Sequence, residues 1–521
     1  MEVLDPATIA VSIIALLILL FCITLARSSR ARLPPSPPGR LPIIGHLHLI
    51  VGAKLPHFLL YNLSRKHSCP LLWLQLGQQS VIVASTPAAA RHILQTNDLI
   101  FAARPPLSVP RHLHGCADIL FASPSDPHWK LLRQLCSSQL FIKKRLEAFR
   151  SMRAQEVHSL LSSILASVGT PITMRSHAHT LSGNIMCRMA FGKRLSDLAV
   201  TAQARPSHRI VDLMAEMNDL LLVFNNLSDH FRFLQKLDLQ RFDRQTRALA
   251  KRFDPVLQEI IDTRYHERRS HNQTEMTPDF LDLLLQSTSL QEGTPQLSYQ
   301  NIKAVFMNIF GGGIDTAALT IEWALGELLA NPAKMMKLQL ELGQVVGMAR
   351  LVEESDLSSL PYLQAVVKET MRLHPIAPLL IPHVASKACE VMGYQIPADT
   401  IAYINVWGIG RDPDTWESPL EFCPERFLGK EIDVNGKHFE LLPFGSGRRG
   451  CPGWMLGLVM VQIAVANLVQ AFEWRIAKEM DITADYGLLF TSSNPLIVQA
   501  SPKLPVHLLQ ANKEIVAGVD Q

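Results

Sequence analysis

The feature that most constrains this chain is one cysteine in a glycine-rich loop that also carries arginines. The loop reads Phe444-Gly-Ser-Gly447-Arg-Arg449-Gly-Cys451-Pro-Gly453. A helical pattern over 454–472 follows it directly. A cysteine at a helix N-terminus beside arginines is expected to have a lowered pKa, which favours the thiolate. Because glycines also leave backbone N–H groups free to bond to sulfur, the loop predicts an anionic sulfur ligand.

Two other chemistries compete for this loop. Glycine-rich turns before helices also bind phosphate, but no Gly-Lys-Ser/Thr follows here. A cysteine nucleophile stays open, although no partner histidine lies nearby in the sequence. The eight cysteines of the chain contain no CxxC pair, so they indicate neither a zinc site nor a disulfide framework. The full pattern, Phe-x-x-Gly-x-Arg-x-Cys-x-Gly, is long, and a thiolate that ligates haem iron favours O–O bond cleavage.

The N-terminus predicts a membrane anchor. Residues 6–26 carry no charge, and a helix of that length spans about 31 Å, which matches a bilayer core. Basic residues follow the stretch, so the positive-inside rule leaves the rest of the chain in the cytosol. The predicted order is a luminal 1–5, a transmembrane 6–26, a basic and proline-rich hinge at 27–40, and one domain over 41–521. A cleaved signal is the alternative, although its apolar region is usually shorter.

Composition excludes several classes of protein. Of 521 residues, 48% are hydrophobic and 18% are charged, which is incompatible with a largely disordered chain. Only one long uncharged stretch exists, which excludes a multi-span membrane protein. Lys+Arg total 50 and Asp+Glu total 46, a balance that predicts no nucleic-acid partner.

The body reads as one large domain, mainly α with minor β-sheets. Strands are expected at 71–76 and 80–84, separated by a glycine-containing turn. Helices are expected at 301–330, ending before Asn331-Pro332, and near 360–373. Short strands are expected around 389–405 and 496–508. The middle of the chain, about 195–300, gives helical patterns with no chemical motif.

The helix expected at 301–330 contains Gly311-Gly-Gly-Ile-Asp315-Thr316-Ala317. Each glycine inside a helix costs about 1 kcal/mol relative to alanine. Three in a row therefore predict either the close approach of a ligand or a local kink. An acid beside a hydroxyl, as in Asp315-Thr316, can organise a water chain that delivers protons.

Three further motifs occur in order along the chain: Trp129-x-x-x-Arg133, Glu369-x-x-Arg372, and Pro424-Glu-Arg426-Phe427. Each is weak alone, because helical pairs at these spacings usually lie on solvated faces. Together with the cysteine loop, the set resembles the cytochrome P450 superfamily of haem-thiolate monooxygenases. The resemblance covers nearly the whole chain. Within the family, the sequence is most similar to plant microsomal enzymes that oxidise flavonoids and phenylpropanoids.

The resemblance implies a cytochrome P450 fold: a single large haem domain behind an N-terminal transmembrane helix. It implies haem b with Cys451 as the axial ligand to iron. Its cofactor-binding residues would be Trp129, Arg133, His383, Phe444, Arg449 and Cys451, with arginines suited to the haem propionates. Glu369, Arg372 and Arg426 would form a structural ion-pair network. Asp315 and Thr316 would be catalytic, and Ala317 departs from the Thr or Ser usual in the family.

The same resemblance places the substrate pocket on the segments 105–121, 304–316, 375–381 and 490–496. Most residues there are apolar, as is usual in small-molecule sites. The candidate substrate contacts are His112, His114, Ile119, Phe121, Ala377, Leu379 and Thr491. Asp118 and Asn494 could also meet substrate hydroxyls.

The function implied by the resemblance is NADPH- and O2-dependent hydroxylation of a small apolar plant phenolic, a phenylpropanoid (lignin-precursor) ring or a flavonoid. Electrons would come singly from NADPH-cytochrome P450 reductase, with the chain in the endoplasmic reticulum membrane. The alternatives are flavone-synthase-type oxidation of a flavanone, triterpenoid hydroxylation, and a haem-thiolate isomerase or dehydratase that needs no NADPH. A non-catalytic haem-binding scaffold is a further alternative, and the intact set of motifs argues against it.

Overall fold

The computed structural model describes residues 32–198, 210–221, 224, 226–270, 278–288, 296–478, 484–486, 489–492 and 494–510. The predicted luminal segment 1–5 and transmembrane helix 6–26 therefore lie outside the described residues. Residues 32–40 of the predicted hinge are described, and they already contact the body. The Arg32 carbonyl accepts from the Gln395 N–H, and the Pro35 carbonyl accepts from the Trp73 N–H. Domain contacts thus begin before residue 41.

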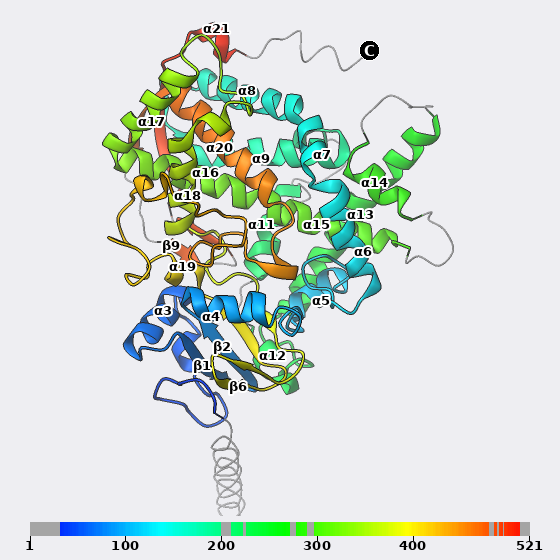
Figure 1. The fold of residues 1–521 in the computed structure, drawn as a ribbon. Coiled ribbons are helices and arrows are strands. Elements are labelled where there is room, and N and C mark those ends of the chain that lie inside the picture. Colours follow the sequence, from blue (N-terminus) through cyan, green and yellow to red (C-terminus); the bar gives the residue numbers. More distant parts are fainter. Residues whose placement is uncertain are drawn as a thin grey trace, which may run out of the picture.

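Helices make up most of the described chain, as predicted (Figure 1). Those of the first half are α2 (Leu47–Ile50), α3 (Pro56–Lys66), α4 (Pro87–Arg91), α5 (Ser108–His114), α6 (Pro127–Leu135), α7 (Lys143–Ala148), α8 (Arg150–Ala166), α9 (Met174–Phe191), α10 (Leu195–Leu198), α11 (Ile210–Leu220), α12 (Leu227–His230) and α13 (Phe242–Ser270). Those of the second half are α14 (Phe280–Gln286), α15 (Tyr299–Gly313), α16 (Asp315–Ala330), α17 (Pro332–Val345), α18 (Pro361–Leu373), α19 (Val406–Ile409), α20 (Trp454–Ala471) and α21 (Val506–Leu509).

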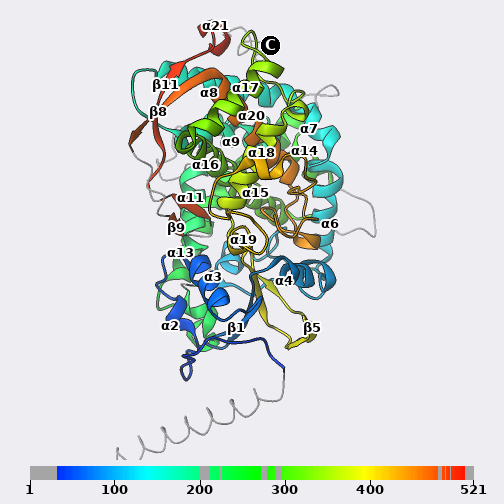
Figure 2. The ribbon, with the colours of Figure 1, turned by 60° about the vertical axis from the view of Figure 1, so that its left-hand side comes forward.

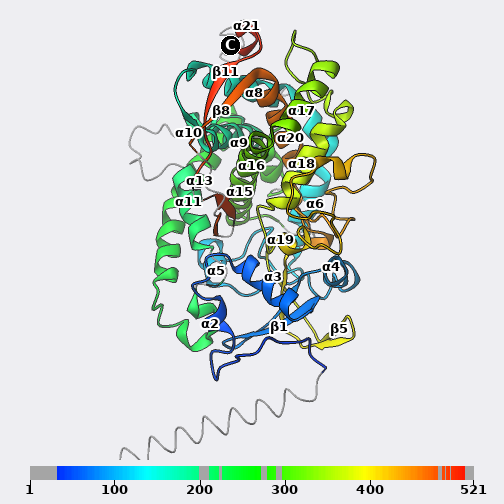
Figure 3. The same cartoon turned by 90° about the vertical axis from the view of Figure 1, so that its left-hand side faces the viewer.

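Four small sheets complete the described fold. The largest has the order β1-β2-β7-β4, from Leu71–Leu76, Gln79–Ala84, Ile401–Ile404 and His383–Val384. A second joins β3 (Ile172–Thr173), β11 (Ile497–Pro502) and β8 (Phe472–Lys478). Two hairpins pair β5 (Cys389–Val391) with β6 (Tyr394–Ile396), and β9 (Ala484–Tyr486) with β10 (Phe490–Ser492). The first two sheets lie at opposite ends of the helical body (Figures 2 and 3).

The sequence patterns locate these elements closely, with two differences. The predicted strand pair is found as β1 and β2, which pair antiparallel from Leu71↔Ala84 to Leu76↔Gln79. The end of the stretch predicted as strand at 496–508 instead forms α21. The helix predicted over 301–330 is divided at Ile314, directly after the three glycines, into α15 and α16. Of the two outcomes expected for the glycine run, the structure therefore shows an interruption of the helix.

The helices α15–α16 and α20 form the centre of the body. The continuous stretch Tyr299–Ala330 and the helix Trp454–Ala471 are long and apolar enough to cross a membrane. However, 67% and 72% of the most apolar 18-residue segments of these two stretches are buried inside the protein. They belong to one large hydrophobic cluster that also includes α8, α9 and α18. These helices therefore serve as core. The glycine run lies where α15 meets α16, and the cysteine loop lies directly before α20.

Candidate active site

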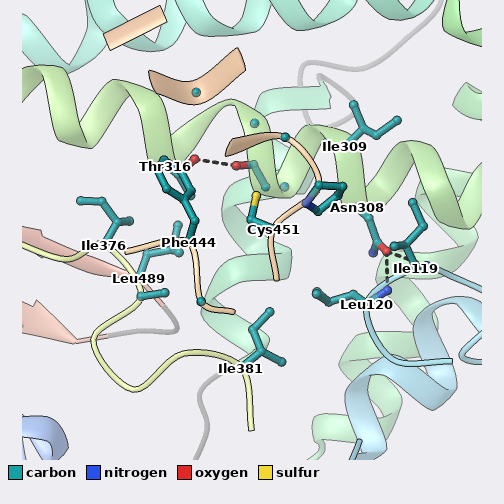
Figure 4. A pocket seen from close by; sticks show the side chains of 18 of the residues that line it. Ile119, Leu120, Asn308, Ile309, Thr316, Ile376, Ile381, Phe444, Cys451 and Leu489 are labelled. Atoms are coloured by element: carbon teal, nitrogen blue, oxygen red, sulfur yellow. Dashed lines mark hydrogen bonds between the residues drawn. The ribbon is translucent and has the colours of Figure 1, made fainter. Parts of the chain in front are cut away.

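One cavity brings together most of the predicted site. It has a volume of about 330 Å³, within the usual range for small-molecule sites. The cysteine loop, α15–α16, the segment after α18 and the turn before α6 all contribute walls. Figure 4 shows Cys451 and Phe444 from the loop, Thr316 and Asn308 from α15–α16, and Ile381 from the segment after α18.

The cysteine loop owes its shape to two glycines with left-handed backbone. Gly445 and Gly447 have φ of +67° and +70°, a region that favours glycine over other residues. A Cβ on Gly447 would lie 2.5 Å from the Leu94 carbonyl oxygen, so this position has no room for a side chain. The Cys451 N–H donates to the Phe444 carbonyl at 2.9 Å, which closes the loop just before α20.

The electrostatics of Cys451 correct one sequence-based expectation. The side chain is open to the cavity but enclosed by protein, and burial raises the pKa of its thiol, contrary to the lowered pKa predicted from the loop. The Gly453 N–H and the Arg133 guanidinium act in the opposite direction and lower the pKa. A backbone N–H group and an arginine near the sulfur are partners of the type that the sequence predicts. Without a metal ion, however, the effect of desolvation on the thiol pKa is larger than theirs. A positive metal ion at the sulfur would favour the thiolate further.

The arginines around the cavity fall into two kinds. Arg449 donates to the backbone carbonyls of Ala102 at 2.7 Å and of Ile119 at 3.1 Å, and its guanidinium lies 4.3 Å from the centroid of the Trp129 ring. Trp129 itself donates its indole N–H to the Ile119 carbonyl at 2.9 Å. Both residues therefore hold the segment before α6 in place. Arg133 lines the cavity and donates no hydrogen bond to any residue in the described part of the chain.

His383 also lines the cavity, from β4. Its Nδ1 donates to the Phe101 carbonyl at 2.8 Å, and since a carbonyl can only accept, the proton of the neutral ring is on Nδ1. Burial, followed by the charge of Arg104, lowers the pKa of His383 well below its ordinary value. A neutral His383 has no second donor for a carboxylate, so the basic role expected of it requires protonation.

Sequence reasoning missed Arg104, which lies one residue before the predicted pocket segment 105–121. Its Nε donates to the Leu120 carbonyl at 3.1 Å, and its Nη1 donates to the carbonyls of Ile381 and Pro382, each at 2.7 Å. Burial is the main cause that lowers its pKa well below the ordinary value. Arg104 ties two cavity walls together, and no local motif indicates this role.

The glycine run opens the cavity at one point. Methionines approach Gly311 and Gly313, where an added Cβ would lie 2.6 Å from Met217 and 2.8 Å from Met186. At Gly312 no atom of the described residues lies within 4 Å of an added Cβ. The Thr316 hydroxyl donates to the Gly312 carbonyl at 2.5 Å. The helix therefore offers the cavity a notch with a hydroxyl beside it.

Asp315 stands behind this notch, at the N-terminus of α16. Burial raises the pKa of its carboxyl to about 6, and a hydrogen bond from the Asn218 amide partly offsets the increase. Asn218 belongs to α11 and itself lines the cavity. It lies in the stretch about 195–300, in which the sequence showed no chemical motif, so this link between Asp315 and the cavity was also missed.

The predicted substrate contacts divide into three groups. His114, Ile119, Phe121 and Ala377 line the cavity. His112 and Leu379 do not: His112 is bonded to Asp243 at 3.0 Å, and Leu379 is buried in the cluster behind the β1-β2-β7-β4 sheet. The side chain of Thr491 lies outside what the structure describes, and Asn494 is not among the lining residues.

A polar network on the cavity wall centres on Asn308. Its amide oxygen accepts from the backbone N–H groups of Ile119 and Leu120, and its Nδ2 donates to Asp118 Oδ2 at 3.0 Å. Asp118 Oδ2 also lies 3.1 Å from His114 Nε2. The sequence predicts that the segment 304–316 lines the pocket. It does not predict that Asn308 holds residues 118–120, because these contacts join distant parts of the chain.

The predicted structural residues form one buried cluster outside the cavity. Arg372 donates twice to Glu369, at 2.7 and 2.8 Å, and Arg426 donates to the same carboxylate at 3.0 Å. The Cys423 N–H also donates to Glu369, at 2.7 Å. The two-point contact fits the planar guanidinium of Arg372 to the carboxylate. This cluster fixes the end of α18 against the segment that leads to the cysteine loop.

The residues present fit a haem group. The cavity places a sulfur ligand at one wall, the Arg133 guanidinium, which donates to none of the described residues, and a glycine notch that an added Cβ would fill at Gly312. Cys451 would hold the iron, and Arg133 would bind a propionate.

Comparison with known proteins supports the same assignment. A family model described as Cytochrome P450 matches residues 34–499. A 3,9-dihydroxypterocarpan 6A-monooxygenase from Glycine max is 39% identical over 92% of this chain and 94% of its own length. A flavonoid 3',5'-hydroxylase from Solanum melongena is 37% identical over 93% of both chains. A zebra fish cytochrome P450 solved with abiraterone has a TM-score of 0.71 and 25% identity, covering 86% of this chain and 100% of that one.

Proposed function

Because this chain belongs to the cytochrome P450 family and is a cytochrome P450 monooxygenase, we propose that it hydroxylates a small apolar plant phenolic, either a phenylpropanoid (lignin-precursor) ring or a flavonoid. The observation that carries the proposal is the cavity that lies between Cys451 and the notch at Gly312, with mostly apolar walls. The relatives named for pterocarpan and flavonoid oxidation support the phenolic class.

Two polar side chains of the cavity, Asn308 and Thr316, already have hydrogen-bond partners, which favours a substrate with few hydroxyl groups. Asn308 already bonds to Asp118 and to two backbone N–H groups, and the Thr316 hydroxyl already bonds to Gly312. A heavily hydroxylated substrate would bury donors and acceptors that lack partners, at about 1–3 kcal/mol each. An aromatic ring with one or two hydroxyls avoids most of that cost.

Bound haem supplies the oxygen-activating chemistry, with NADPH as the electron source through a cytochrome P450 reductase. The chain would contribute three things. Cys451 holds the iron, the apolar walls exclude bulk water, and Asp315 with Thr316 delivers protons into the cavity beside Gly312. The pKa of about 6 suits Asp315 to this role, because a proton donor works best when its pKa is near the operating pH.

The function is tested in microsomes that hold the full chain and a reductase. The panel contains flavanones, hydroxycinnamaldehydes, hydroxycinnamyl alcohols and triterpenes, and product mass is the readout. We expect one phenolic class to gain one oxygen atom, with NADPH and O2 consumed. Cys451→Ala is the matched negative control. Loss of two hydrogens without oxygen gain would indicate flavone-synthase-type chemistry, and conversion without O2 uptake would indicate an isomerase or dehydratase.

We further propose that residues 6–26 anchor the chain in the endoplasmic reticulum membrane, with the haem domain in the cytosol. The support is the length of the uncharged stretch and the basic residues that follow it. Protease protection of intact microsomes tests the topology. We expect complete digestion of the domain from the cytosolic side, and a protected domain would contradict the proposal.

A further inference from the structure

Asp315 faces two side chains from two different helices. One carboxylate oxygen, Oδ2, accepts from the amide of Asn218 on α11, toward the cavity. The other, Oδ1, lies 3.3 Å from Nε2 of His179 on α9. Only 18% of the Asp315 side chain is exposed. Direct exchange of protons between this carboxyl and bulk water is therefore restricted, and His179 is the titratable group that lies against it.

His179 is partly enclosed by protein and partly exposed. Its Nε2, the atom near Asp315, is buried and makes no hydrogen bond of good geometry with the described residues. Yet 28% of the side chain is exposed. Its neighbours Ser176 and Thr180 on α9 are exposed, so this face of the helix reaches the surface. His179 is therefore a residue that lies against Asp315 and is also partly accessible to solvent.

Two other charged groups near the pair, Arg175 and Glu322, form an ion pair with each other. Arg175, one turn before His179, lies 2.7 Å from Glu322 on α16. Burial, followed by the charge of Arg175, lowers the pKa of His179 to about 4. Glu322 also accepts from the Leu496 N–H at 2.8 Å. At neutral pH, His179 is therefore uncharged, and it can take up a proton on one nitrogen as it gives one from the other.

We propose that His179 is the positioning residue that relays protons from solvent to Asp315. This proposal rests on the role of Asp315 in the proposed function. A hydronium ion gives its proton to Nδ1 and becomes water. The Nε2 proton moves to Asp315 Oδ1, so that the carboxylate becomes a carboxylic acid. The ring is left neutral with its proton on Nδ1, and exchange with water restores the other tautomer. Asp315 then releases its proton on the cavity side.

The test compares His179→Gln with His177→Gln in the full-length, haem-loaded enzyme. His177 lies on the same helix, but its ring contacts Ser163 at 3.3 Å rather than Asp315, so it is a matched control. We expect His179→Gln to lower the product formed per NADPH by about threefold or more, to release peroxide, and to increase the solvent isotope effect on product formation. The carbon-monoxide spectrum and substrate affinity should match those of the wild type, as all properties of His177→Gln should.

Two results would overturn the proposal. One is wild-type coupling and an unchanged isotope effect in His179→Gln while Asp315→Asn alters both. The other is an equal loss in His177→Gln, which would indicate a structural effect of α9. If Asp315→Asn itself changed nothing, the role of Asp315 in the proposed function would fail as well. If His179→Gln failed to fold, His179→Asn would be measured in the same way, and the same outcomes would decide.

Discussion

Two carboxylates, the buried Glu369 and the half-buried Asp315, show how the same chemical group serves two purposes in this protein. Glu369 accepts hydrogen bonds from two guanidinium groups and from one backbone N–H. Asp315 accepts one amide hydrogen bond and faces a neutral imidazole. The first carboxylate lies in a closed network of donors. No Lys or Arg among the described residues pairs with the second, so burial raises its pKa and lets it exchange protons.

The largest effect is expected when the charge of Glu369 is removed, which tests its structural role. Glu369→Gln leaves Arg372 and Arg426 buried without their counterion, which typically costs about 3–5 kcal/mol. We expect a large fall in the thermal midpoint and in the yield of folded haem protein. Asp356→Asn is the control, because its partner Arg350 is 44% exposed and such pairs contribute about 1 kcal/mol or less. Equal effects of the two changes would contradict the structural role of Glu369.

The pH dependence of stability tests the opposite property of Asp315. Its folded pKa of about 6 is above the unfolded value of about 3.9, so the folded state holds the proton more tightly. The contribution of Asp315 to the free energy of unfolding is about 3 kcal/mol below pH 4. It is lost as the pH rises through 6. Asp315→Asn should remove this term. We therefore expect denaturant unfolding to show the variant gaining stability over the wild type between pH 4 and 7, and a constant difference would contradict it.

The same substitution, Asp315→Asn, also tests whether this carboxyl delivers protons during catalysis. With Asp315→Asn the cavity keeps its shape but loses the carboxyl that releases protons. We expect product formed per NADPH to fall about tenfold, a modest share of the range for general acid catalysis. Parallel measurement of NADPH, peroxide and product gives the coupling directly. Full coupling in the variant would show that protons reach the cavity by another route.

The smallest effect is expected at Thr316. Thr316→Ala removes the hydroxyl beside the glycine notch, and we expect a several-fold loss of coupling with peroxide released, because water can partly replace the hydroxyl. Thr320→Ala is the matched control, since that hydroxyl donates to the Thr316 carbonyl at 2.8 Å one turn away. Unaltered coupling in Thr316→Ala would refute the relay role of its hydroxyl.

Much of this site could be predicted from local patterns. The cysteine loop, the glycine run and the Glu-x-x-Arg motif are short segments whose chemistry depends on neighbours in sequence. The loop and the Glu-x-x-Arg motif are found on the predicted elements, whereas the glycine run ends α15 rather than lying inside one helix. Arg104, Asn218 and Asn308 could not be predicted, because their roles depend on partners far away in the chain. Asn218 meets Asp315 across 97 positions, and Arg104 meets Ile381 across 277. The thiol pKa of Cys451 was also mispredicted, since desolvation depends on the whole cavity rather than on the loop.

The central claim is that Cys451 ligates haem iron through its sulfur. The most direct test is the absorption spectrum of the reduced protein with carbon monoxide, for the full-length wild type and for Cys451→Ala. We predict that the wild type shows the red-shifted band of a thiolate-ligated haem and that the variant lacks it. The same band in both proteins, or its absence from folded, haem-loaded wild type, would contradict the account.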